Sequence, residues 1–233
     1  MAAAFSQTPV SAQQLPPGLI PDSSPYQAGK LLVREDFDGN LSGWVPETPP
    51  EPRSRIGIVR GKLVIDVAKG ATVWLKKPLS GNILITYTQE VVMDHGPNDR
   101  LSDLNQFWMA TDPRRSNLFT RTGVFSQYDS LRMYYVGFGG NHNTTTRFRK
   151  YHGNGQRQIL KEYTDAAHLL KPNHPYRIAI TVFRGRTEFF VDGEKWFSYQ
   201  DPHPLLRGYF GFRTTEARQR IDAFRVYRLE AKN

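Results

Sequence analysis

The sequence contains no cysteine and no long hydrophobic run. The first absence excludes disulfide bonds, a thiolate nucleophile and any zinc site built from cysteine. The second excludes a membrane-spanning helix, which needs about 20 predominantly apolar residues. Helical periodicity is also scarce. TDAAHLL at 164–170, followed closely by Pro172, is the one segment with a helical pattern, and we expect one or two turns there.

Acidic residues are few relative to basic ones. The chain has 22 Asp and Glu against 31 Lys and Arg, a formal net charge of +9. Such a charge attracts polyanions, which include nucleic acids, anionic membranes and acidic polysaccharides. No zinc-finger spacing, basic zipper or RNP-like pattern is present, so we expect no nucleic-acid partner. We expect a monomer that binds an acidic polysaccharide or oligosaccharide and does not bind membranes.

The residues that are abundant favour strands. A chain of 233 residues with 39% hydrophobic content is long enough for one sandwich domain. In TVFRGRTEFFVDGEKWFSY, turns at Arg184-Gly185 and Asp192-Gly193 predict a three-stranded meander. The expected strands are 31–37, 55–59, 62–67, 71–76, 82–92, 104–109, 121–126, 132–138, 145–151, 157–161, 175–183, 186–191, 194–199, 208–213 and 220–229. The pattern predicts an all-β fold of antiparallel sheets.

The first 29 residues are expected to form an extension ahead of a single domain at 30–231. MAAAFSQTPVSAQQLPPG is similar to the tail of a signal peptide, and Val10 and Ala12 fit the small-residue cleavage rule before Gln13. An ordinary disordered tail is the alternative. On the first interpretation the protein is secreted or periplasmic.

Three segments are similar to concanavalin A-like jelly rolls: LLVREDFDGNLSGWVPE, YRIAITVFRGRTEFFVDGEKWFSY and RGYFGFRTTEARQRIDAFRVYRL. The resemblance covers roughly 30–230. The central GFGGNHNTTTRFRKYHG resembles an uncharacterised bacterial family related to polysaccharide lyases and other carbohydrate-active proteins. This implies a β-jelly-roll sandwich of two antiparallel sheets, with sugar bound on the concave face of one sheet.

The block from Arg132 to Lys161 concentrates tyrosine, histidine, amide and basic residues in alternating, strand-like segments. Alternation at period two places Tyr134 and Val136 on one face and Met133 and Tyr135 on the other. One face is too polar to be core, although a solvated outer face would also account for it. The side chains expected to bind substrate are Asn105, Trp108, Gln127, Tyr128, Arg132, Tyr134, Arg149, Tyr151 and His152.

These residue types suffice for β-elimination on a uronic-acid polymer. A lyase must neutralise the C5 carboxylate, remove the adjacent proton with a base and protonate the departing glycosidic oxygen. The carboxylate would be neutralised by Asn143, Gln127 or Arg147. The proton would pass to His142, because histidine is largely neutral near pH 7, or to Tyr135. Tyr135 would then donate to the leaving oxygen, and no cofactor is required.

Two other functions stay open. The Arg-x-Glu-x-Arg, Gln-(Ile/Val)-His and Tyr-x-Lys-x-Gly-x-Tyr strands of jelly-roll alginate and glucuronan lyases are absent. Glycoside hydrolysis needs two carboxylates, and the Glu-x-Asp-x-x-Glu motif of the retaining hydrolases with this fold is absent as well. A non-catalytic module would bind sugar through its tryptophans, although core packing is the commoner fate of tryptophan in an apolar strand. Trp108 is the exception, because it neighbours the polar Asn105 and Gln106, and both fates stay open for it.

Three aspartates offer ligands for a structural calcium. Asp36, Asp38 and Asp222 lie near the expected first and last strands, and calcium takes 6–8 oxygen ligands. The alternative is an ordinary turn at Asp38-Gly39.

Overall fold

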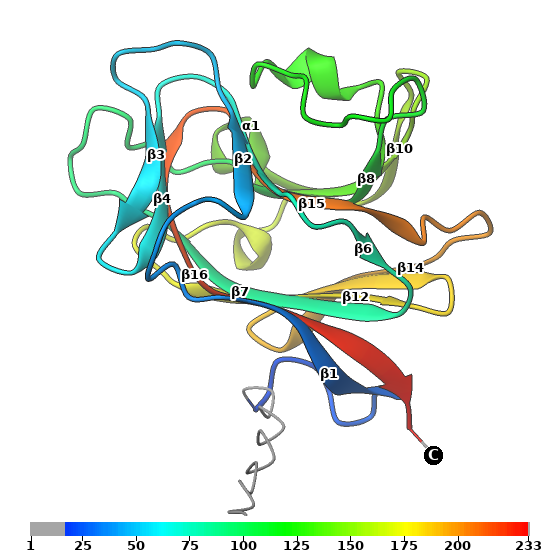
Figure 1. Ribbon diagram of the computed structural model, residues 1–233. Coiled ribbons are helices and arrows are strands. Elements are labelled where there is room, and N and C mark those ends of the chain that lie inside the picture. Colours follow the sequence, from blue (N-terminus) through cyan, green and yellow to red (C-terminus); the bar gives the residue numbers. More distant parts are fainter. Residues whose placement is uncertain (1–16, 233) are drawn as a thin grey trace, which may run out of the picture.

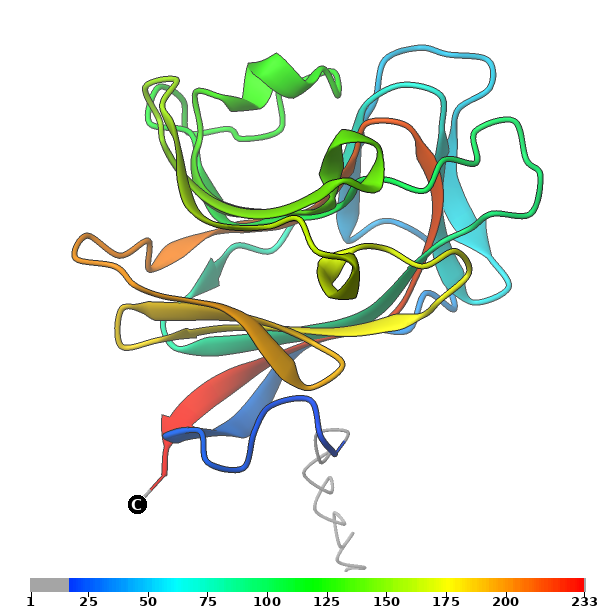
Figure 2. The same cartoon turned by 180° about the vertical axis from the view of Figure 1, so that it is seen from behind.

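The computed structural model describes residues 17–232, so the proposed cleavage region at Val10 and Ala12 lies outside the described residues. Two antiparallel sheets of eight strands each stack face to face (Figures 1 and 2). The first consists of β1 (Tyr26–Glu35), β3 (Arg55–Val59), β4 (Lys62–Val67), β7 (Ile83–Val91), β12 (Tyr176–Phe183), β13 (Arg186–Val191), β14 (Glu194–Gln200) and β16 (Ala217–Ala231). The second consists of β2 (Trp44–Glu47), β5 (Ala71–Leu75), β6 (Leu79–Ser80), β8 (Leu104–Thr111), β9 (Arg132–Gly139), β10 (Thr145–His152), β11 (Arg157–Tyr163) and β15 (Arg207–Thr214).

The sheets have different strand orders. The first runs β14-β13-β12-β7-β16-β4-β3, with β1 also paired to β16. The second runs β11-β10-β9-β8-β15-β5-β2, with β6 paired to β15, and its outer face is concave (Figure 2). This architecture confirms the predicted sandwich of two antiparallel sheets.

The main core lies between the sheets and takes alternate residues of each strand. On β9, Tyr134 and Val136 face this core, whereas Met133 and Tyr135 belong to a second apolar cluster. The predicted alternation along this strand is therefore confirmed. The meander is confirmed as well, because β12, β13 and β14 pair in sequence and their turn residues have positive φ angles.

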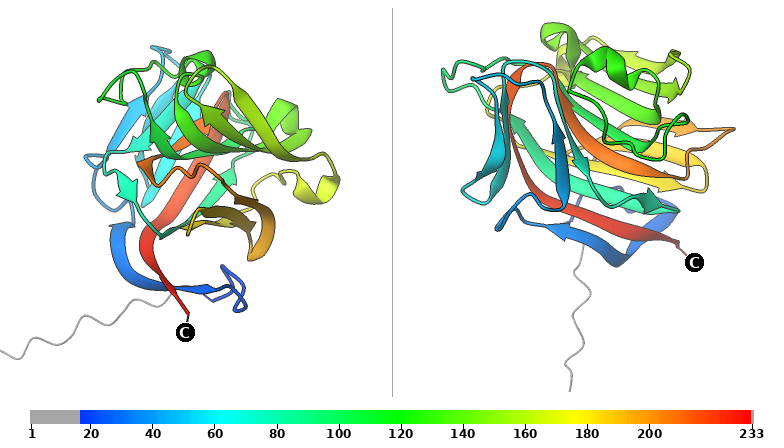
Figure 3. Two further views of the ribbon diagram at one scale, coloured as in Figure 1. Left: turned by 90° about the vertical axis from the view of Figure 1, so that its right-hand side faces the viewer. Right: turned by 45° about the horizontal axis from the view of Figure 1, so that its top comes forward.

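The second apolar cluster fills much of the concave outer face. A segment of residues 112–131, which we call the covering segment, crosses this face between β8 and β9 (Figure 3). Leu118, Tyr128 and Leu131 of the covering segment pack on residues of the sheet that include Trp74 and Phe107. The concave face is therefore not an open groove along its whole length.

A buried carboxylate fixes the covering segment to the sheet. Glu47, at the end of β2, is only 5% exposed. Its Oε2 accepts hydrogen bonds from Trp74 Nε1 at 2.7 Å and from Tyr128 Oη at 2.8 Å, and its Oε1 accepts one from the backbone N–H of Arg121 at 2.8 Å. Hydrogen bonds to a charged group in the interior are stronger than those between neutral groups. One side chain thus joins β2, β5 and the covering segment.

The buried cation of Arg213 reinforces this attachment. Arg213 of β15 is 1% exposed, and no carboxylate in the described part of the chain forms an ion pair with it. It donates to the carbonyl of Gly123 at 2.5 Å, and its guanidinium carbon lies 5.3 Å and 5.1 Å from the ring centres of Phe125 and Tyr128. The cation is held by a carbonyl and by aromatic faces.

Four local expectations differ from the structure. The expected strand at 121–126 is a loop that leads into the 3₁₀ helix η1 (Phe125–Tyr128), because its apolar residues pack down on the concave face. The one or two helical turns expected at 164–170 are a single turn of 3₁₀ type, η2 (Ala166–His168). The short strands β2 and β6 were not expected. β1 begins at Tyr26, ahead of the domain boundary expected at residue 30.

Within residues 17–232, the structure contains no helix with the length and apolar character that crossing a membrane requires.

We expect Glu47→Gln to lower the free energy of unfolding by about 2 kcal/mol, because three buried donors lose a charged acceptor. Equilibrium urea unfolding measures this change. Glu194→Gln is the matched control, since Glu194 is exposed on β14 and should change stability by less than about 0.5 kcal/mol. Equal stability of the two variants would contradict the role assigned to Glu47.

Candidate functional site

A pocket of about 320 Å³ opens on the concave face beside the covering segment. We call it the concave-face pocket. Most of its wall comes from the β9–β10 hairpin, in which Arg147 pairs with Gly137 and Arg149 with Tyr135. The lining residues are Arg100, Asp103, Phe125, Tyr135, Gly137, Gly140, Asn141, His142, Thr145, Arg147, Arg149 and Thr215. A single hairpin therefore delivers most of the polar side chains.

The turn of this hairpin, α1 (Gly140–Asn143), is left-handed. Asn141 has φ 52° and ψ 54°, and His142 has φ 57° and ψ 46°. Each non-glycine residue in this conformation costs about 1–2 kcal/mol, less for asparagine. Strain of this kind is concentrated at functional sites. The exposed His142 thus stands at the pocket rim in a conformation that glycine would adopt more readily.

Asn143 anchors the turn. Its Nδ2 donates to the carbonyl of Leu170 at 2.9 Å, and its Oδ1 accepts from the N–H of Leu170 at 2.8 Å. Both ends of the amide are therefore occupied, and Asn143 is not among the lining residues. The prediction that Asn143 neutralises a substrate carboxylate is wrong for this geometry.

Among the three arginines that line the pocket, Arg149 is the one that is available to bind an anion. Arg147 forms an ion pair with Glu162. Arg100 is paired with Asp103, and one of its nitrogens lies 3.8 Å from Glu216. Arg149 forms no ion pair with any residue of the described chain, and its guanidinium carbon lies 5.4 Å from the centre of the Tyr135 ring.

Tyr135 lies below Arg149 and is 4% exposed. Burial, and secondarily the neighbouring Tyr151, raises the pKa of the Tyr135 hydroxyl far above its ordinary value, so it stays protonated at neutral pH. The group can donate a hydrogen bond but is a poor base. A methyl group on Gly137 would stand 3.0 Å from Tyr135 Oη, so the glycine leaves space beside this hydroxyl.

The pocket has one carboxylate in its wall, Asp103, among the residues that the structure describes. Asp103 is paired with Arg100, and it also accepts hydrogen bonds from Ser102 at 2.9 Å and Asn105 at 3.3 Å. Hydrolysis of a glycoside by two carboxylates requires a second acid across the scissile bond. The lining residues do not supply it.

The structure brings four of the predicted residues together in this pocket: His142, Tyr135, Arg147 and Arg149. Five residues predicted to bind substrate are buried instead: Asn105, Trp108, Tyr128, Tyr134 and Tyr151. The prediction for Trp108 is wrong because its indole stacks on Phe148 inside the main core, with ring centres 5.6 Å apart. Tyr134 also faces the core, and its hydroxyl donates to Asp201 at 2.5 Å.

The remaining predicted residues lie elsewhere. Arg132 and His152 are cross-strand partners at the far end of the hairpin, where they line another pocket of about 520 Å³. Gln127 belongs to the covering segment, and its Oε1 accepts from the backbone N–H of Thr122 at 2.9 Å. These side chains do not join His142 in one site.

The expected calcium ligands do not converge. Asp36 forms ion pairs with Arg34 and Arg225, and Asp222 lies 3.6 Å from Lys62 Nζ. Within residues 17–232, no three histidine, aspartate or glutamate side chains are arranged to hold a metal ion. The carboxylates Asp36, Asp38 and Asp222 therefore do not form the predicted site in this structure.

Several lining residues were not predicted from the sequence to belong to a site, among them Arg100, Phe125 and Asn141. Asn141 lies next to a predicted residue, and the run GGNHN signals a tight turn with positive φ angles. Arg100 reaches the pocket from a loop and Phe125 from the start of η1, and no sequence pattern marks either approach.

We expect His142→Gly to raise the free energy of unfolding by about 1 kcal/mol, because glycine adopts the left-handed conformation without a Cβ penalty. Urea unfolding measures this gain. His152→Gly is the control, since His152 lies in the regular strand β10, where glycine lowers stability. A loss of stability in both variants would show that the turn at His142 is not strained.

Three solved structures share this two-sheet architecture. A protein of unknown function with a galectin-like fold from Bacillus subtilis has 18% identity and a TM-score of 0.74, over 89% of this chain and 100% of that one. The carbohydrate-binding module CBM66 from Bacillus subtilis has 10% identity and a TM-score of 0.55, over 81% and 96%. An endo-β-1,3-glucanase from Pyrococcus furiosus has 12% identity and a TM-score of 0.59, over 87% and 95%.

At these identities the similarities establish the fold, and they confirm the predicted jelly roll. No curated protein matches the sequence. A family model described as a domain of unknown function (DUF6250) matches residues 65–224, which span both sheets and the whole concave-face pocket. By this match the chain belongs to the DUF6250 family.

Proposed function

We propose that this protein binds an acidic carbohydrate in the concave-face pocket, and that Arg149 receives a uronate carboxylate of the ligand. The observation that carries the proposal is the guanidinium of Arg149, which forms no ion pair within the described chain and stands in a pocket lined mostly by polar side chains. A planar guanidinium matches the geometry of a carboxylate and can bind it through two parallel hydrogen bonds.

The other lining residues suit a sugar. Tyr135 Oη donates to a ring or hydroxyl oxygen, while Asn141 and Thr145 both donate and accept. Phe125 offers an aromatic surface to the apolar face of a pyranose ring. A few polar groups around one aromatic surface are typical of small-ligand pockets.

The carboxylate content of the pocket favours a sugar-binding function over glycoside hydrolysis. The fold occurs in a glucanase and in a carbohydrate-binding module, so it is compatible with both functions. Within the described chain, Asp103 is the one carboxylate in the pocket wall. It already forms an ion pair with Arg100, which ties it to the protein rather than to a ligand. A pair of free carboxylates on opposite sides of a bound sugar is missing there.

β-Elimination is a second candidate for the same site, because His142 and Tyr135 line it together with Arg149. In this scheme Arg149 neutralises the uronate carboxylate in place of Asn143. His142 removes the C5 proton, the electron pair forms the C4–C5 double bond, and the C4–oxygen bond breaks. Tyr135, whose raised pKa keeps its hydroxyl protonated at neutral pH, donates its proton to the departing oxygen.

The ligand class implies a location. Polymers rich in uronic acid are extracellular materials, so we propose that the protein acts outside the cytoplasm, secreted or periplasmic. The excess of basic residues would concentrate it near such polymers.

We expect Arg149→Gln to weaken binding to an oligouronate at least about tenfold, because a charge-assisted hydrogen bond contributes about 1.5–3 kcal/mol. Isothermal titration calorimetry with purified oligouronates measures the dissociation constant. Arg184→Gln is the matched control, since Arg184 also stands over an aromatic ring, Phe183, but far from the pocket. Equal affinities of the two variants would contradict the proposed site.

Product analysis separates binding from catalysis. Incubation with a panel of polyuronides should leave the polymers intact, with neither ultraviolet absorbance from an unsaturated product nor new reducing ends. A rise in absorbance that His142→Ala and Tyr135→Phe both abolish would establish elimination instead. New reducing ends without that absorbance would show hydrolysis and contradict both proposals.

A further inference from the structure

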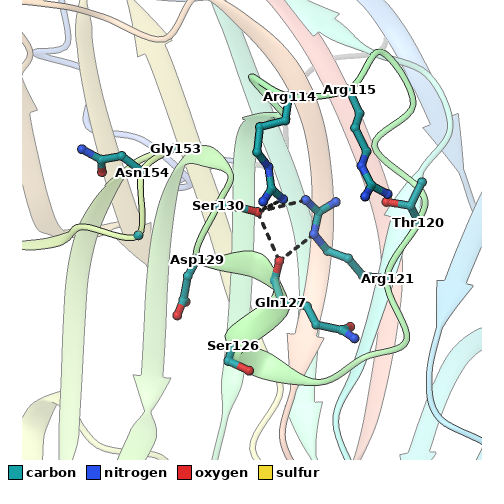
Figure 4. Close-up of a pocket in the computed structure, with 11 residues that line it drawn as sticks. Arg114, Arg115, Thr120, Arg121, Ser126, Gln127, Asp129, Ser130, Gly153 and Asn154 are labelled. Atoms are coloured by element: carbon teal, nitrogen blue, oxygen red, sulfur yellow. Dashed lines mark hydrogen bonds between the residues drawn. The ribbon is translucent and has the colours of Figure 1, made fainter.

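A second pocket lies on the other side of η1. It has a volume of about 550 Å³, and we call it the covering-segment pocket (Figure 4). Phe125 at the start of η1 lines the concave-face pocket, whereas Ser126 and Gln127 of the same turn line the covering-segment pocket. The lining residues are Arg114, Arg115, Thr120, Arg121, Ser126, Gln127, Asp129, Ser130, Gly153, Asn154 and Gly155. The 3₁₀ helix is therefore the wall between the two pockets.

Arg121 lines the pocket, but its side chain is bonded within the protein. Its side chain is 5% exposed, and it donates to the carbonyls of Leu118 and Gln127, each at 2.8 Å. It also forms an ion pair with Asp112 at 2.5 Å. Burial alone would raise the pKa of Asp112, but hydrogen bonds from the Arg114 amide and the Arg121 side chain hold it below its ordinary value. Both charges of this pair are satisfied within the protein.

Arg114 and Arg115 are available to a ligand. Arg114 is 58% exposed, with one nitrogen 2.5 Å from Ser130 Oγ and another 3.4 Å from Asp112. Arg115 is exposed and forms no ion pair with the described residues. Figure 4 shows Arg114 directed toward Ser130 and Arg121, with Arg115 beside Thr120. The two guanidinium groups present a positive rim above a floor that is already hydrogen bonded.

Arg157 extends the positive charge across η1. It pairs with Asp129 at 2.5 Å, which neutralises the carboxylate in the wall of the covering-segment pocket. Its guanidinium carbon also lies 5.2 Å from the centre of the Phe125 ring, which lines the concave-face pocket. Positive groups thus occur in both pockets and on the ridge between them.

We propose that the covering-segment pocket is a second subsite for the same acidic saccharide chain, in which Arg114 and Arg115 bind a further uronate. The inference rests on the proposed function of the concave-face pocket. Because the covering segment fills the concave face, a ligand chain that leaves the first pocket has its path along the sheet blocked and crosses η1. The second contact is then intramolecular, and it raises affinity only for chains long enough to span both pockets.

The test compares oligouronates of increasing length by calorimetry. For the unaltered protein, affinity should rise at least about tenfold once the chain reaches both pockets. The double variant Arg114→Gln, Arg115→Gln should remove this gain and leave the affinity for the shortest ligand unchanged. Arg115→Gln alone avoids any disturbance of Ser130 and should remove part of the gain. Thermal unfolding confirms that each variant is folded.

The outcomes separate the two proposals. Weakened binding of every ligand in Arg149→Gln, with a length-dependent loss in the double variant, supports both subsites. An unchanged length dependence in the double variant overturns the second subsite but leaves the first intact. Unaltered binding in Arg149→Gln contradicts the proposed function itself, whatever the double variant shows.

Discussion

The buried carboxylate of Glu47 is the constraint on which the shape of the concave face depends. It is bonded to Trp74 in the floor of the sheet and to Tyr128 and the Arg121 amide in the covering segment. Without it, three donors would be buried without an acceptor, which costs more than an ordinary hydrogen bond contributes. Since this attachment holds the covering segment down, the concave face carries separate pockets on either side of η1.

The same attachment shapes the charge of the site. Arg213 is a buried cation without an ion pair in the described chain, and burial lowers the pKa of its guanidinium, although arginine stays charged at neutral pH. It is the cross-strand partner of Asn105 beneath the concave face. Its charge adds to the positive potential that Arg149 presents at the surface. An anionic ligand would compensate both charges, which links the stability of the covering segment to the acidic ligand that we propose.

The strands were predictable because period-two alternation and glycine turns are local signals, as the meander around Arg184-Gly185 shows. Tyr135, His142 and Arg149 were predictable as one group because a single hairpin carries them. The side of the sheet that faces the core was not predictable, which is why the buried Trp108 was expected at the surface. The covering segment was missed because its apolar residues, such as Phe125, pack against a sheet face formed by other parts of the chain, and no local pattern signals that contact.

The left-handed turn α1 holds two exposed residues, Asn141 and His142, in a fixed position at the pocket. Asn143 bonds both backbone groups of Leu170, so the end of the turn is tied to another segment. Asn141 and His142 are then held in a conformation that few residues share, and they lose little further backbone freedom when a ligand arrives. The conformational cost of the left-handed turn therefore lowers the free energy of unfolding and does not lower the affinity for a ligand. Asn143, first expected to contact substrate, instead supports the turn that presents its two neighbours to the pocket.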